Sequence, residues 1–183
     1  MPGLKFLTLL DQSDAPALAD GAMGTLLNAR GVSFDQCFDA LNLIQPSLVS
    51  DIHREYIEAG AQVIQTNTFG ANRYKLAAHG LESQLVEINR AGVDLARRAA
   101  ETASREVYIA GDVGPLGVRL APFGRVQPEQ ARQAFAEQIR ALAEAGVDLL
   151  VIETFSDLIE LCEAIAAARQ VCDLPVVASM TYT

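Results

Sequence analysis

The chain has 183 residues, of which 50% are hydrophobic and 20% are charged, a composition typical of a globular protein with a substantial core and not of a disordered one. Its formal net charge of −9 would repel a phosphate backbone, which makes nucleic acid a poor candidate partner. No apolar run approaches the roughly 20 residues that a helix needs to cross a bilayer, so no membrane span is predicted.

The N-terminal segment does not have the features of a signal peptide. Its apolar stretch, residues 4–10, is interrupted by Lys5 and is not followed by a small-residue cleavage site. Cys37, Cys162 and Cys172 include no CxxC pair, which suits a reducing compartment and argues against a disulfide framework. We therefore expect a cytoplasmic protein whose cysteines are small, semi-apolar core residues.

Residues 1–16 form a polar lead-in, and from residue 17 to residue 183 apolar runs of strand length alternate with amphipathic segments of helix length. This alternation predicts βαβ units and a parallel sheet. The predicted strands are residues 17–20, 62–66, 107–111, 148–153 and 175–180. None of them alternates between apolar and polar residues, so we expect all of them to be buried on both faces.

The helices between these strands have recognisable ends. Pro46 fits the first turn of a helix that ends before Gly60, and Pro128 opens a helix that ends before Gly146. Ser156 can cap the next helix. The inward face of that helix is predicted to consist of Leu158, Cys162 and Ile165.

One segment is repeated loosely further along the chain. Residues 58–69 and 144–155 both read as a helix end, a glycine turn, a strand and a Thr-Phe exit. Roughly two units of 40 residues separate the copies, which favours a (β/α)8 barrel of about 250 residues with the first five of its eight units present. The rival is a five-stranded doubly wound sheet, but the chain has neither the GxGxxG nor the Walker spacing of a nucleotide-binding loop.

Active sites of such barrels form at the C-terminal ends of the strands. The polar residues at these positions are Asp20, Thr66, Asn67, Thr68, Asp112, Glu153 and Thr154. Because this set contains acids and no lysine or histidine, we expect a site that attracts a metal ion or a substrate ammonium. Lys5 and Lys75 lie outside it, which disfavours a Schiff-base aldolase.

Each acid also has a structural interpretation. Asp20 precedes a glycine and fits either a turn or a functional carboxylate. Glu153 follows a buried strand and must find a cation or several donors, which favours function. Asp112 is interpreted as tying down the long loop 111–127, a loop that could also be a lid. Both histidines, His53 and His79, are expected on the solvated surface.

Three separated motifs carry a family resemblance. They are Asp20-Gly21-Ala22-Met23-Gly24-Thr25, Thr66-Asn67-Thr68-Phe69-Gly70-Ala71-Asn72 and Ile152-Glu153-Thr154-Phe155. In order and spacing they resemble the homocysteine-binding barrel of the homocysteine S-methyltransferases, which include cobalamin-dependent methionine synthase. Residues 35–39 and 114–117 look most like the bacterial bifunctional form, in which this barrel is fused to a methylenetetrahydrofolate reductase.

The resemblance implies a methyltransferase that converts homocysteine to methionine. In the family, carboxylates matching Asp20 and Glu153 hold the homocysteine ammonium, while backbone groups of residues 21–24 and of the loop 66–69 hold its carboxylate. The implied substrate-binding residues are Asp20, Gly21, Ala22, Met23, Gly24, Thr66, Asn67, Thr68, Phe69 and Glu153. The implied methyl donor is a methylfolate, methylcobalamin or S-methylmethionine.

The family also implies zinc, held by three cysteines from motifs after the sixth and eighth strands, which prepares the substrate thiol for attack. The sequence ends at Thr183, after the fifth predicted strand, and Cys37, Cys162 and Cys172 do not match those motifs. We therefore expect no metal ligand and no catalytic residue here, and no methyl transfer without the C-terminal half of the barrel. The open sheet edge is expected to pair with another chain.

Two other interpretations stay open. One is a non-catalytic remnant, or a partner-dependent module, that binds an amino acid or a partner subunit. The other is an unrelated barrel enzyme, a lyase or hydrolase, that uses Asp20, Asp112 and Glu153 around a divalent metal.

Overall fold

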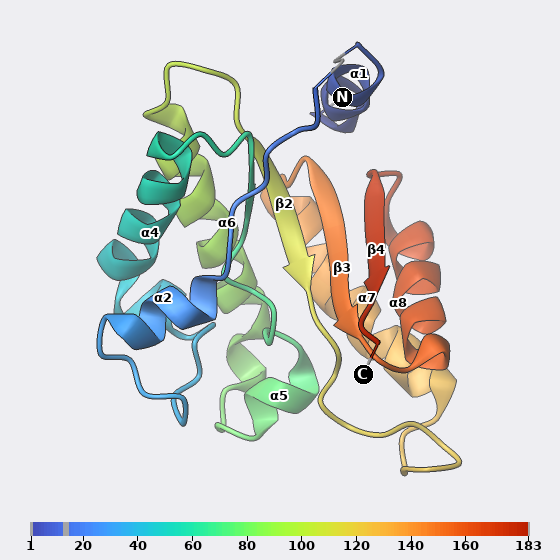
Figure 1. The fold of residues 1–183 in the computed structure, drawn as a ribbon. Helices are drawn as coiled ribbons and strands as arrows, with labels where there is room; N and C mark the ends of the chain where they lie inside the picture. The colour runs from blue at the N-terminus through green and yellow to red at the C-terminus, as the bar shows by residue number, and fades with distance from the viewer. Residues whose placement is uncertain (1, 13–14, 183) are drawn as a thin grey trace.

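The computed structural model describes residues 2–12 and 15–182, and its centre is a four-stranded parallel sheet (Figure 1). The strands are β1 (Val63–Gln65), β2 (Tyr108–Val113), β3 (Leu149–Phe155) and β4 (Val176–Met180). They lie side by side in the order of the sequence, and Gln65, Ala110 and Leu149 share one row across the sheet. The α/β class with a parallel sheet is thus confirmed.

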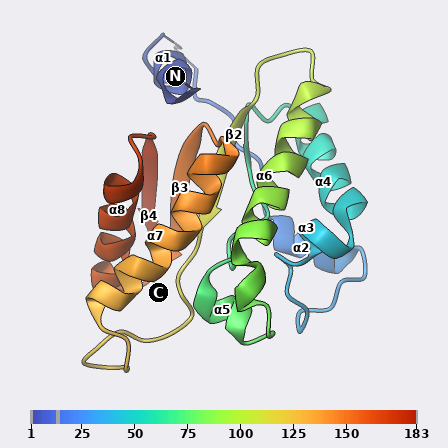
Figure 2. The same cartoon turned by 180° about the vertical axis from the view of Figure 1, so that it is seen from behind.

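The helices are α1 (Pro2–Gln12), α2 (Met23–Ala29), α3 (Leu41–Ile44), α4 (Pro46–Glu58), α5 (Arg73–Ala77), α6 (Leu85–Glu101), α7 (Pro128–Ala145) and α8 (Leu158–Val171), with a 3-10 helix, η1, at Glu82–Gln84. In the two opposite views α6, α7 and α8 cover the same face (Figures 1 and 2). A doubly wound sheet carries helices on both faces, so this arrangement argues against that rival. None of the described helices is both long and apolar enough to cross a bilayer.

The main core fills the space between the sheet and these helices. Phe135 of α7 and Phe155 of β3 are fully buried, and their ring centroids are 5.8 Å apart. On α8 the buried positions include Leu161, Ala164 and Ala168, which follow helical spacing. The two alanines have small side chains, which lets α8 pack closely against α7.

The helix ends agree with the sequence at α4 and α7 and differ at α8. Pro46 and Pro128 open the first two helices, and Gly60 and Gly146 follow them with φ of 113° and 93°. The cap of α8 is Asp157, whose side chain accepts hydrogen bonds from the backbone N–H groups of the first turn, so the prediction of Ser156 is wrong.

The predicted inward face of α8 is also wrong in part. Leu158 and Cys162 are exposed and Ile165 is half-buried. Close packing against α7 favours the alanine face of α8, and the larger side chains therefore turn outward.

The two outer strands of the prediction behave differently from the central ones. Residues 17–20 form a single bridge, between Ala19 and Val63, in place of a strand, although Asp20 N donates to Val63 O at 2.9 Å. On β4, Val177 and Ser179, which share one face, are exposed, because nothing in the described part of the chain covers that face. The expectation that every strand is buried on both faces is therefore wrong for β4, whereas β2 is buried throughout.

The lead-in contains helix α1, which the sequence analysis did not predict; residues 1, 13 and 14 of the lead-in, and Thr183 at the other end, lie outside the described residues. Phe6 of α1 is buried, and its ring lies edge-on to Tyr108 with centroids 5.6 Å apart. Phe6 joins Val63, Ala110 and Leu149 in a small cluster on the face of the sheet opposite to α6, α7 and α8.

His53 contradicts its prediction as a surface residue. It lies on α4, which packs against α6, and it is fully buried with neither ring nitrogen hydrogen-bonded. Burial lowers the pKa of His53 to about 4. His79 is exposed as predicted.

Candidate active site

A pocket of about 790 Å³ lies at the C-terminal ends of β1, β2 and β3. All of the predicted substrate-binding residues line it except Thr68. The other lining residues are Thr25, Phe34, Gln36, Cys37, Phe38, Asp39, Gln65, Gly70, Lys75, Ala78, His79 and Asp112.

The alternation of side chains along the strands explains why the polar groups converge. Residues two apart on a strand share a face, so Asp112 follows Tyr108 and Ala110 on the face away from the helices. By the same rule Gln65 follows Val63, and Glu153 follows Leu149 and Val151. The apolar members of these rows form the cluster below, and the polar members at the strand ends form the pocket.

Asp20 is a half-buried side chain, and only one of its two carboxylate oxygens has a hydrogen-bond partner. Its Oδ2 accepts a hydrogen bond from the backbone N–H of Gln65 at 2.8 Å, while its Oδ1 is buried without a partner. Burial raises the pKa of Asp20 to about 7, with a smaller contribution from the charge of Glu153. Such a group gains a strong interaction when a cation enters the pocket.

Asp112 is buried in an environment similar to that of Asp20. It does not tie down the loop 111–127, which was the role predicted for it. Its Oδ1 is buried without a partner, and burial, followed by the charge of Glu153, raises the pKa of Asp112 well above its usual range. The loop that it was expected to tie down is held instead by Glu160 of α8, which accepts from the backbone N–H of Leu116 at 2.8 Å.

Glu153 is aimed at the pocket by an irregularity in β3. The register between β3 and β4 shifts between Ile152 and Phe155, and Thr154 has a φ of 64°, which is rare for a β-branched residue. Glu153 is half-buried and accepts a hydrogen bond from Thr154 Oγ1 at 2.9 Å. Strain of this kind is typical of functional sites.

The polar residues after β1 brace the loop around the pocket. Thr68 is fully buried away from the pocket, and its hydroxyl donates to the Asp112 carbonyl at 2.8 Å, so its predicted contact with substrate is not supported by the geometry. Asn67 lines the pocket, but its amide donates to the carbonyl of Phe38 at 2.7 Å and to Asn42 Oδ1 at 3.0 Å. The side chains of Asn67 and Thr68 hold three segments together.

Two charged residues of the pocket were missed. Lys75, which the sequence placed outside the site, lines the pocket with its Nζ 4.3 Å from the centre of the Phe69 ring. Asn72 caps the short helix α5 by accepting from the N–H groups of Tyr74 and Lys75. Asp39 is buried and accepts from the backbone N–H of Gly70 at 2.8 Å. The sequence signal that could have indicated Lys75 is Asn72, a residue type that commonly caps helices and that closely follows the predicted strand 62–66.

Phe69 depends on the absence of a side chain at residue 114. A Cβ on Gly114 would lie 2.4 Å from Phe69 Cε2. Gly114→Ala should therefore displace the ring and destabilise the protein by about 1–3 kcal/mol, the usual range for overpacking. Urea denaturation measures this effect. Adding Phe69→Leu should recover part of the loss, and additive losses in the double variant would contradict the contact.

The cysteines do not form a metal site. All three are free: Cys37 and Cys172 are half-buried and Cys162 is exposed, so the expectation of a core residue is wrong for Cys162. Burial raises the pKa of Cys37, with a further contribution from the charge of Asp39. Within residues 2–12 and 15–182, no group of three His, Cys, Asp or Glu side chains is placed to hold a metal ion.

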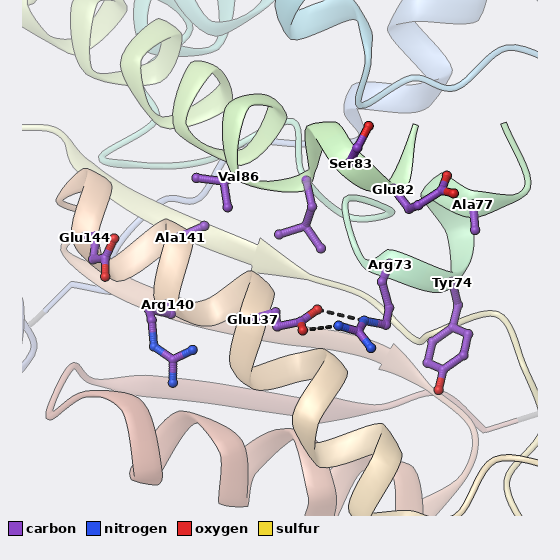
Figure 3. Close-up of a pocket in the computed structure, with 11 residues that line it drawn as sticks. Arg73, Tyr74, Ala77, Glu82, Ser83, Val86, Glu137, Arg140, Ala141 and Glu144 are labelled. Atoms are coloured by element: carbon purple, nitrogen blue, oxygen red, sulfur yellow. Dashed lines mark hydrogen bonds and ion pairs between the residues drawn. The ribbon is translucent and has the colours of Figure 1, made fainter. Parts of the chain in front are cut away.

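A second pocket, of about 670 Å³, lies on the outer surface between α5, η1, α6 and α7 (Figure 3). Three of its charged residues are paired: Arg73 makes a two-pronged ion pair with Glu137, and Glu144 pairs with Arg90 of α6. None of its described lining atoms is a buried polar group without a partner. The unmet hydrogen-bonding needs therefore point to the pocket at the strand ends.

The family model of the homocysteine S-methyltransferases matches residues 17–183. The chain belongs to this family. The resemblance read from the three motifs is thus confirmed, and these motifs meet at the pocket described above.

Individual members of the family agree over most of the chain. It is 33% identical over 162 residues to methionine synthase of Mycobacterium tuberculosis and 32% identical to that of Mycobacterium leprae, in each case over 84% of this chain. Structures of the homocysteine methyltransferase MmuM from Escherichia coli superpose with TM-scores of 0.76 for the metallated form, at 29% identity over 96% of this chain, and 0.81 for the oxidised form, at 30% identity over its full length.

These relatives are longer than the chain. It spans 14% and 13% of the two methionine synthases. It spans 65% and 66% of the metallated and oxidised MmuM structures.

Proposed function

We propose that these residues form the homocysteine-binding part of an S-methyltransferase that converts homocysteine to methionine. The observation that carries this proposal is that Asp20 and Asp112 line one pocket and that each has a buried carboxylate oxygen, Oδ1, without a hydrogen-bond partner. Buried acceptors of this kind are costly unless a ligand supplies a donor. A substrate ammonium, which has three N–H donors, meets that need.

The arrangement of charge supports an ammonium better than a metal ion. Asp20, Asp112 and Glu153 line one pocket, but no three acids are close enough to coordinate one ion in the described ranges. This argues against a metal-dependent lyase or hydrolase built on these three acids. An ammonium needs only two or three acceptors and tolerates wider spacing.

We also propose that the intact enzyme uses zinc to favour the thiolate of homocysteine, as the family resemblance implies. The metallated MmuM structure supports a metal in a relative. Cys37, Cys162 and Cys172 do not fit such a site, because they lie apart and none belongs to a cluster of ligands. The residues described here therefore bind and orient the amino acid, and no methyl transfer is expected from them alone.

We further propose that the four strands and the bridge at Ala19 are the first five units of a (β/α)8 barrel. The sequential strand order and the helices on one face support this proposal. The exposed face of β4 would then be covered by the C-terminal half of the barrel. The methyl donor, whether methylfolate, methylcobalamin or S-methylmethionine, would be bound by other parts of the protein, such as a fused folate-reductase domain. The free cysteines support a cytoplasmic location.

Glu153→Gln tests the assignment of the site. Loss of a charge-assisted contact should weaken homocysteine binding by ~1.5–3 kcal/mol, measured by isothermal titration calorimetry. Glu144→Gln, in the outer pocket of Figure 3, is the matched control and should leave the affinity unchanged. If Glu144→Gln weakened homocysteine binding and Glu153→Gln did not, the ligand would have to bind in the outer pocket.

A further inference from the structure

Lys75 brings an ammonium group into a pocket whose other charged lining residues are all acids. These acids are Asp20, Asp39, Asp112 and Glu153. An amino-acid substrate is a zwitterion, so its carboxylate has to be held near the same acids that attract its ammonium. A cation placed in this wall would offset that repulsion.

The stem of Lys75 runs through a slot between two glycines. Its Cδ lies 3.3 Å from the position that a Cβ would take on Gly70, and its Cγ and Cε lie 3.2 Å from that position on Gly117. Gly117 has a φ of 78°, a conformation that side chains disfavour. The slot therefore depends on both glycines, and it restricts the conformations of a stem that would otherwise be flexible.

The slot is held in place by backbone contacts of the loop that follows β2. Leu116 N donates to Glu160 Oε1 at 2.8 Å, and Gly114 N donates to the Phe69 carbonyl at 3.1 Å. These bonds fix the segment that carries Gly117 against the segment that carries Gly70. The ammonium of Lys75 is thus positioned by the fold.

Within residues 2–12 and 15–182, the ammonium has no hydrogen-bonded partner. Its Nζ lies over the Phe69 ring, and no carboxylate of the described residues lies within 4.0 Å of it. Asp39, Asp112 and Glu160 are near enough to favour its charged form, although burial lowers the pKa of Lys75. A half-buried cation with unused donors is suited to bind an anionic group.

We infer that Lys75 binds the α-carboxylate of the amino-acid substrate while Asp20 and Asp112 accept hydrogen bonds from its ammonium. The inference rests on the proposed function. Asp112 lines the same pocket as Lys75 and Asp20, and the charges of Glu153, Asp39, Asp20 and Lys75 all act on it. Lys75 adds a side-chain contact to the backbone groups that the family resemblance assigned to the carboxylate.

The test compares two ligands and two variants. Homocysteine and 3-aminopropane-1-thiol differ only in the carboxylate, and both are titrated into wild type, Lys75→Met and Asp20→Asn. Lys75→Met should weaken homocysteine binding about 10- to 100-fold and change the affinity for the amine less than about 3-fold. Asp20→Asn should weaken both ligands by the same factor, because both carry the ammonium.

Failure of the proposed function and failure of the role of Lys75 give different results. If the wild type binds neither ligand, the proposed function is wrong and the inference falls with it. If the wild type binds homocysteine and Lys75→Met loses nothing, or loses equally for both ligands, only the role of Lys75 is overturned. A second measurement on the wild type keeps the test valid if the Lys75→Met variant fails to fold. The ¹⁵Nζ resonance of Lys75 should shift when homocysteine is added and not when the amine is added. Equal shifts with both ligands would overturn the inference.

Discussion

Homocysteine should bind more tightly as the pH rises through about 7, and Asp20→Asn should weaken that dependence, leaving the part that comes from Asp112. The pKa of Asp20 is raised to about 7, so below this pH the free protein carries a neutral carboxyl group that attracts an ammonium poorly. Each unit of pH below 7 should cost up to about tenfold in affinity. Titration calorimetry between pH 5 and 7.5 measures the effect below the range in which a free thiol ionises.

At pH 7.5, Asp20→Asn should also weaken binding about 30- to 150-fold, since a charged acceptor is replaced by a neutral amide. Stability should move the other way. Because the folded-state pKa of Asp20 is raised, the ionised carboxylate destabilises the fold above pH 7, and the asparagine variant should be at least as resistant to urea there. A variant that loses both affinity and stability would indicate a structural role for Asp20.

His53→Leu should remove an acid-sensitive weakness of the fold. The pKa of His53 falls from 6.5 to about 4 on burial, so the folded protein favours the neutral ring. Between pH 4 and 6.5 the unfolded chain binds more protons than the folded one, and this contribution to stability is lost as the pH falls. It is fully present above pH 6.5. From pH 8 to pH 5 the wild type should lose about 2 kcal/mol that the leucine variant keeps.

The measurement is the difference between the unfolding free energies of wild type and variant in urea at the two pH values. Taking the difference cancels Asp20 and Asp112, whose raised pKa values act in the opposite direction. His79→Gln is the control, since His79 is exposed and should show no such change. If the unfolding free energies of wild type and His53→Leu changed equally with pH, water would have to reach the His53 ring.

The outcome for His53 shows where sequence reasoning stops. The sequence around it reads as an outer helix with a polar histidine, and only the packing of α4 against α6 places that ring in the interior. The same holds for α8, where the cap moved by one residue to Asp157 and the alanine face turned inward. Both errors concern the rotation of a helix about its axis, which depends on what the helix packs against.

The sequence by itself determined the parallel α/β fold, the ends of α4 and α7, and three motifs whose residues meet at one pocket. These features are local, because capping residues, apolar runs and strand ends act through their own neighbours in the chain. Only the tertiary structure decided that Asp112 faces the pocket, that Thr68 does not, and that Lys75 reaches it through a slot between Gly70 and Gly117. These outcomes depend on contacts between segments far apart in the sequence, and burial at such contacts sets the charge and position of each group.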